Sequence, residues 1–205
     1  MSTALHPVHA ERRDVRTILT TGVELGLATV AGVVTFALLS RSMSGRAEVV
    51  IQSLIILAGG ALASYLPAAS VRPRSVDAIG WSALIGLLGA VVFTVIDTAV
   101  LRPLKLYPWT WDAIGGGSGW WYLPLWFMGS AFLAWLGALV YAYRARAVAE
   151  VNVIALAVQT VGLAIVIFGV LTGTGLAPFH AAIAGLAYAV SLVIHVPVVA
   201  VLNRQ

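Results

Sequence analysis

The sequence contains no cysteine, and this absence removes disulfides, thiolate metal sites and cysteine nucleophiles together. Histidine boxes, an HExxH zinc motif and clustered aspartates are missing too, so the di-iron, zinc-protease and prenyl-transfer chemistries that use them are excluded. Lysine occurs once, as Lys105 in a polar connection, which leaves no buried lysine for a retinal Schiff base. We therefore predict no metal site, and the residues identify no cofactor.

Charge is also scarce. Only 10% of the 205 residues are charged, whereas a soluble domain carries about a quarter. Hydrophobic residues make up 60% of the chain, and the mean hydropathy is +0.97. They fall into six runs of about 20 residues, the length that crosses a bilayer as a helix. The sequence predicts an all-α polytopic membrane protein, a bundle of six transmembrane helices at residues 17–40, 49–69, 78–101, 120–143, 151–171 and 178–202.

The domain organisation follows from these runs. Residues 1–16 form a polar tail, and residues 17–205 form a single transmembrane domain with a predicted external loop at 102–119. The first apolar run is too long for a signal-peptide core, so we interpret it as a retained helix. Pro178 is expected in the first turn of the sixth helix, where its missing N–H is not needed.

The basic residues predict how the chain is threaded, because cytoplasmic connections are enriched in lysine and arginine. With six spans, eight of the twelve basic residues fall on the side that holds both termini, which predicts cytoplasmic N- and C-termini. The eight are Arg12, Arg13, Arg16, Arg72, Arg74, Arg144, Arg146 and Arg204, against Arg41, Arg46, Arg102 and Lys105 on the other side. This explains the net charge of +4 without nucleic acid, and favours a multi-pass protein of a bacterial-type inner (plasma) membrane.

Small residues recur at helix-packing intervals, including Gly22 with Gly26, Ala28 with Gly32, and Gly86 with Gly89. Small side chains let helix backbones approach closely in lipid. We interpret these positions as bundle packing, and we find no internal repeat of the kind that inverted-repeat transporters carry.

Four ionisable side chains fall inside the predicted spans, where such groups are costly and mark candidate sites. Asp97 and His180 both fall near the outer ends of their helices, which predicts that they meet beside the external loop. Glu24 and His195 fall in the inner half of the bundle. We interpret them as a possible intramembrane polar pair and favour an ordinary interhelical contact, worth about 1 kcal/mol.

The segment 107–127 is unlike the rest of the chain. It holds five of the seven tryptophans, two tyrosines and the run Gly115-Gly116-Gly117-Ser118-Gly119. Its aromatic rings suit a membrane-interface belt, a cover for a lipophilic ligand, or a contact with another subunit. The predicted ligand-binding residues are Asp97, Trp109, Trp111, Asp112, Trp120, Trp121, Tyr122, Trp126 and His180.

The run Gly116-Gly117-Ser118-Gly119 resembles the GxSG motif of rhomboid intramembrane proteases. In that family the serine opens the fourth helix and the catalytic histidine lies near the outer end of the sixth. The resemblance implies a Ser118–His180 dyad for acyl transfer. The second predicted helix, however, lacks the histidine and asparagine of the family's oxyanion site.

The run Trp109-Thr110-Trp111-Asp112 resembles the end of the tryptophan-rich WxWD signature of haem-handling proteins of cytochrome c maturation. This resemblance implies haem contact at the outer face, with His180 in the place of one flanking histidine. The other flanking histidine is absent.

The favoured interpretation is non-enzymatic. We expect an integral inner-membrane protein that binds a small or lipophilic ligand, or a partner subunit, at its outer face. This covers a small transporter and an accessory subunit of a membrane complex. We expect the protein to lie in the lipid bilayer. Its expected partners are other membrane subunits or a second copy of the chain. The serine hydrolase and the haem-handling protein are the alternative functions.

Overall fold

The computed structural model describes residues 14–106 and 123–202, and these ranges are helical with no strand. Six segments are long and apolar enough to cross a membrane, which confirms the predicted all-α bundle of a multi-pass membrane protein. The elements are α1 (Val15–Ser42), α2 (Gly45–Val71), α3 (Val76–Ile96), the π-helix η1 (Asp97–Leu101), the π-helix η3 (Leu123–Met128), α5 (Gly129–Arg144), α6 (Val153–Gly173) and α7 (Ala181–Leu202).

The helix ends differ from the predicted ones where proline is involved. The second helix continues through Pro67 to Val71 and ends at Arg72, whose φ of 55° is left-handed. Pro178 lies before α7 and not in its first turn, so that prediction is wrong. The side chain of His180 caps this helix instead, because its Nδ1 accepts a hydrogen bond from the Ala182 N–H at 3.1 Å.

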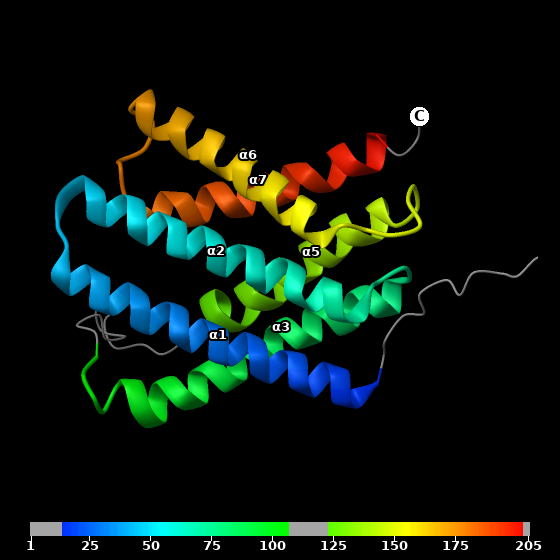
Figure 1. Cartoon of the computed structure of the whole chain (residues 1–205), viewed down its shortest axis with the longest axis horizontal. Coiled ribbons are helices and arrows are strands. Elements are labelled where there is room, and N and C mark those ends of the chain that lie inside the picture. The colour runs from blue at the N-terminus through cyan, green and yellow to red at the C-terminus, as the bar shows by residue number, and fades with distance from the viewer. Residues whose placement is uncertain (1–13, 107–122, 203–205) are drawn as a thin grey trace, which may run out of the picture.

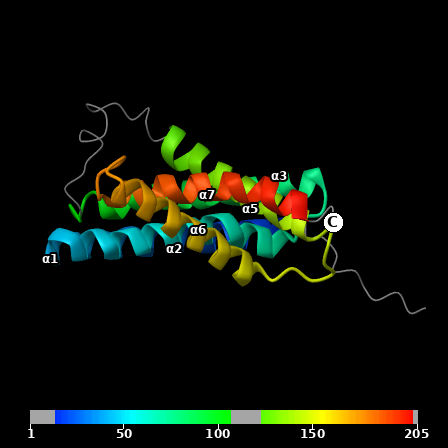
Figure 2. The ribbon, with the colours of Figure 1, turned by 90° about the horizontal axis from the view of Figure 1, so that it is seen from above.

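The helices form two layers (Figures 1 and 2). One layer contains α1, α2 and α6, with α2 in the middle, and the other contains α3, α5 and α7. α2 contacts each of the other five long helices, so it is the centre of the bundle. The start of α1 and the end of α7 lie at the same end (Figure 1), which we call the terminal end.

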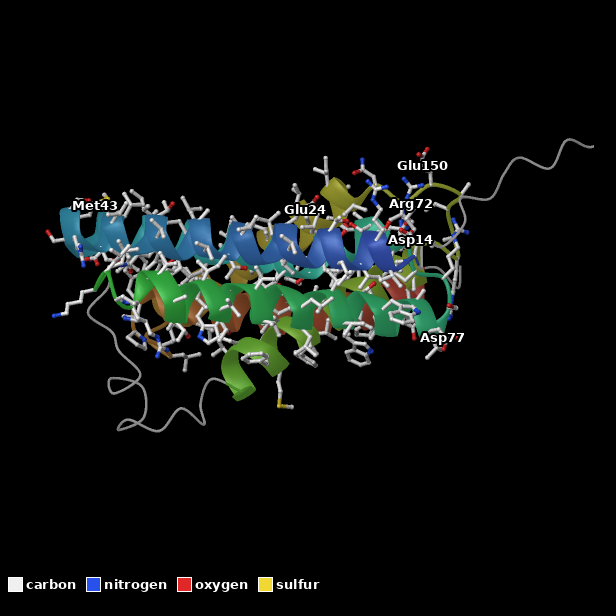
Figure 3. All side chains as sticks on the ribbon, turned by 90° about the horizontal axis from the view of Figure 1, so that it is seen from below. Asp14, Glu24, Met43, Arg72, Asp77 and Glu150 are labelled. Carbon is white, nitrogen blue, oxygen red and sulfur yellow. The ribbon has the colours of Figure 1, made fainter. Side chains whose placement is uncertain are left out.

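Figure 3 shows the labelled Asp14, Arg72, Asp77 and Glu150 at the terminal end, and Met43 at the opposite end. The opposite end holds the turn between α1 and α2, η1, and the connection before α7. Gln52 joins α1 to α2 there, because its Nε2 donates to the Ser40 hydroxyl at 2.7 Å.

Glycine sets the distance between several helix pairs. A Cβ atom at Gly86 of α3 would lie 2.5 Å from the backbone oxygen of Ser130 in α5. A Cβ at Gly26 of α1 would lie equally close to Val92 of α3. Backbones that approach this closely gain the dispersion contacts that hold helices together in lipid. Most of the small residues expected to pack helices therefore do so.

Candidate ligand cavity

A cavity of about 610 Å³ lies between α1, α2, α3, α5 and α7. Small-molecule sites in proteins usually enclose about 300–1,000 Å³, with mainly apolar walls and a few polar groups. This cavity fits that description, because most of its lining residues are apolar and its charged ones are Asp97 and Arg102, with Thr29, Ser130 and Tyr188 as further polar side chains. The residues that matter for the argument below are Gly32, Gly59, Gly60, Phe93, Asp97, Arg102, Trp126 and Tyr188.

Glycines in α1 and α2 leave the space open. A Cβ added at Gly32 or at Gly59 would meet no atom within 4 Å. Gly60 differs, because its missing side chain makes room for the ring of Tyr188, which lies 2.8 Å from the position of a Cβ. Gly32 was expected to pack helices together, with Ala28, but both residues line the cavity instead.

One partly buried ion pair marks the polar end of the cavity. Asp97 begins η1 with its side chain only 3% exposed, and its Oδ2 accepts a hydrogen bond from Arg102 Nε at 3.1 Å. The two residues come together because the Arg102 N–H bonds to the Asp97 carbonyl, five residues back, in the π-helical pattern. The arginine side chain is 34% exposed, so the pair reaches from the cavity to the surface.

A second π-helical segment, η3, reaches the same part of the cavity. It packs against α3 and carries Trp126, whose ring centroid lies 4.6 Å from that of Phe93. Aromatic pairs at this distance add to the stability that their burial gives. π-helical turns are rare and often occur at functional sites. Two of them at one cavity make this region the strongest site candidate among the described residues.

The chain that follows η1 is tied to the end of α1. Arg41 Nη2 donates to the backbone oxygen of Lys105 at 2.9 Å. Lys105 has a φ of 48°, which is unusual for a residue with a side chain. The contact joins the backbone three residues after Arg102 to the end of α1.

The cavity is open at its side. Gly59, Leu62 and Phe132 line it and are also exposed on the outer surface of the bundle. Leu62 is 46% exposed and Phe132 47% exposed. These residues belong to helices that are long and apolar enough to cross a membrane, so this exposed part of the cavity wall lies within the spans.

The predicted ligand-binding residues divide into three groups. Asp97 and Trp126 line the cavity. His180 is exposed at the start of α7 and is not among the lining residues, so the structure does not bring it to Asp97. The remaining ones lie outside the described residues, and these are Trp109, Trp111, Asp112, Trp120, Trp121 and Tyr122. Ser118 of the predicted Ser118–His180 dyad lies outside the described residues as well.

Glu24 and His195 do not form the expected pair. Glu24 is exposed on α1, and Figure 3 shows it on the face turned away from α3. His195 is buried in α7, where its Nδ1 lies 2.7 Å from the hydroxyl of Thr160 in α6. That hydroxyl also lies 2.6 Å from the hydroxyl of Tyr65 in α2. His195 thus takes part in a polar link between three helices.

The hydrogen-bonding capacity of Thr160 suggests how this link is arranged. Its hydroxyl has one proton and two acceptor positions, and it also lies 3.0 Å from the Leu156 carbonyl, which only accepts. All three contacts are satisfied when Thr160 donates to Leu156 and accepts from both Tyr65 and a protonated His195 Nδ1. A second link lies nearby, where the Tyr188 hydroxyl donates to Ser64 Oγ at 3.1 Å.

Several cavity residues were not predicted from the sequence. Arg102 is separated from Asp97 by five residues, a spacing that brings charges together in a π-helix but not in an α-helix. The pair Gly59-Gly60 was a visible signal, because two glycines in mid-helix leave room beside the backbone. Tyr188 gave no such signal, since its position depends on the crossing of α2 and α7.

Comparisons of the chain with protein-family models, with curated proteins and with solved structures found no match. Among the described residues, no group of three or more histidine, aspartate or glutamate side chains is placed to hold a metal ion.

Proposed function

We propose that this protein binds a lipophilic molecule in the cavity, with the polar part of that molecule at Asp97 and Arg102. The observation that supports the proposal is the cavity itself, which combines about 610 Å³ of space, mainly apolar walls and one partly buried ion pair at one end. A polar group placed at the end of an apolar pocket fixes the orientation of a ligand.

The length of the cavity indicates the kind of ligand. Its wall in α1 extends from Leu25 to Phe36, which at 1.5 Å per residue is about 16 Å. This is roughly half of the 30 Å hydrocarbon core, the depth that one lipid chain occupies in one leaflet. A molecule with a single hydrocarbon chain and a polar head therefore matches the cavity in length and in polarity.

The exposed wall residues support entry from the bilayer. A lipophile dissolved in the membrane would reach the cavity past Leu62 and Phe132, without crossing water. The tryptophan-rich segment follows Arg102 in the chain, so we expect its rings to cover the polar head or to contact a partner subunit. In this proposal the protein serves a bacterial-type inner membrane, as a small transporter or as an accessory subunit that holds a lipophilic ligand.

Filling the cavity tests the proposal. Gly59→Leu adds a large apolar side chain at the cavity wall, at a position where a Cβ would meet no atom within 4 Å. The probe is a single-chain fatty acid with a photoreactive diazirine, added to membranes that contain the protein. We expect the wild-type protein to be labelled mainly at residues 25–36 and 55–63, and the variant to lose most of that labelling.

Gly80→Leu is the matched control, because Gly80 is exposed on α3, away from the cavity, and its Cβ would also meet nothing. This variant should be labelled like the wild type. Labelling spread evenly over all lipid-facing helices, and unchanged by Gly59→Leu, would show that the cavity holds no such ligand.

A further inference from the structure

Two polar side chains within the predicted membrane spans are exposed and have no partner among the described residues. Glu24 of α1 and Gln159 of α6 are both exposed, and both lie within segments that cross the membrane. Within residues 14–106 and 123–202, neither makes a hydrogen bond or an ion pair. Water does not satisfy polar groups inside a bilayer, so such side chains normally face protein. Each of them therefore indicates a contact that residues 14–106 and 123–202 of one copy do not supply.

The two groups lie at similar depth. Glu24 is nine residues from the start of α1 and Gln159 is six residues from the start of α6, and both helices start at the terminal end. At 1.5 Å per residue Glu24 is about 13 Å along α1 and Gln159 about 9 Å along α6 from the first residue of each helix. α1 and α6 also form the two edges of one layer, with α2 between them (Figure 1).

Small residues accompany both polar groups. Ala31 is exposed two turns along α1 from Glu24, and Gly162 is exposed one turn along α6 from Gln159. A Cβ at Gly162 or at Gly169 would meet no atom within 4 Å. Surfaces of this kind let a second helix approach closely in lipid, where packing and polar contacts drive association.

We propose that the protein forms a symmetric dimer in which α1 of each copy packs on α6 of the other. A two-fold axis along the membrane normal places the α1–α2–α6 layers face to face in opposite order, so the contact occurs twice. Glu24 then bonds to Gln159 of the partner subunit. An amide both donates and accepts, so it pairs with a carboxyl group in either protonation state.

A second copy fits better than an unrelated protein because this chain carries both halves of the contact. The two polar groups are complementary and lie at matching depth on opposite edges of one layer. Dimers built on α1 alone would instead bring two Glu24 side chains together, which offers less hydrogen bonding than a carboxyl–amide pair.

The absence of native cysteine makes a cross-linking test clean. Two differently tagged variants, Leu27→Cys and Gly162→Cys, are expressed together and oxidised in the membrane. Both positions are exposed and lie one turn from the polar groups, which stay intact. We expect a disulfide between the two variants, and at least a several-fold lower yield when Glu24→Leu is added to both chains.

Thr20→Val is the control for that loss, because the Thr20 hydroxyl already bonds to the Arg16 carbonyl of its own helix at 2.9 Å. It should leave the cross-linking yield unchanged. The molecular mass in mild detergent should correspond to a dimer for the wild type and to a monomer for Glu24→Leu, with helix content unchanged. Cross-links only between two Leu27→Cys chains, or none between copies, would overturn the proposal.

Discussion

Thr160 joins three helices through one hydroxyl group, so its removal should have a measurable cost. Thr160→Val keeps the shape of this fully buried side chain but leaves the Tyr65 hydroxyl and His195 Nδ1 without the hydroxyl that they contact. Hydrogen bonds between membrane helices contribute on average about 0.6 kcal/mol and at most about 1.7. We expect a loss of about 1–2 kcal/mol in the free energy of unfolding, measured in detergent with a chemical denaturant.

The control for this prediction is Thr172→Val in the same helix. Among the residues that the structure describes, the Thr172 hydroxyl bonds only to the Phe168 carbonyl of its own helix, at 2.8 Å, so the change should cost less than about 0.5 kcal/mol. Equal effects of the two substitutions would mean that the link to Tyr65 and His195 adds no stability.

At the residue scale, the sequence indicated which ionisable side chains lie within the spans and how deep they lie. It did not indicate in which direction those side chains point. The position of Asp97 inside a span identified it as a site candidate, and it lines the cavity. The outward direction of Glu24 was not predictable, because the lipid-facing and buried sides of a membrane helix are both apolar. Without a polar side for comparison, the spacing of hydrophobic residues does not show which face is buried.

Among the elements, the contact between α2 and α5 depends most directly on glycine. A Cβ at Gly137 would overlap the backbone carbonyl of Ser64, which is held in a helix and has no flexible end to move. Overpacking of this kind typically costs about 1–3 kcal/mol. Gly137→Ala should therefore lower the free energy of unfolding by about that amount, measured as for Thr160.

Gly80→Ala tests whether that loss comes from packing. Gly80 faces open space on α3, so its substitution adds helix propensity without a clash and should leave stability unchanged or raised by up to about 1 kcal/mol. Comparable losses for the two variants would show that the α2–α5 contact adapts to an extra methyl group.

The helices themselves were predictable because each apolar run is as long as the bilayer is thick. Their ends were less so. Pro67 stays inside α2, although proline usually ends a helix, and the two π-helical segments left no signal in the sequence. The π-helical turns depend on how η1 and η3 pack against α3. The helix propensities of neighbouring residues do not determine packing between distant segments.

For the whole molecule, the two-layer arrangement explains why a cavity of this size exists in a small bundle. α2 contacts all five other long helices, so the helices on opposite sides of α2 are separated by the width of α2 itself. Where α2 carries Gly59 and α1 carries Gly32, that width is not filled by side chains. The cavity is a consequence of glycine at the centre of the fold.

The direction in which this molecule is threaded decides what reaches the polar end of the cavity. Asp97 and Arg102 lie at the end opposite the terminal end, and the basic residues predict that the terminal end is cytoplasmic. Single cysteines at Ser44 and Ala149, both exposed and at opposite ends, test this in a chain with no native cysteine. We expect a membrane-impermeant maleimide to label Ser44→Cys in intact cells, and Ala149→Cys only after the inner face is exposed. The reverse pattern would place Asp97 and Arg102 on the cytoplasmic side, so a ligand's polar head would have to come from the inner leaflet.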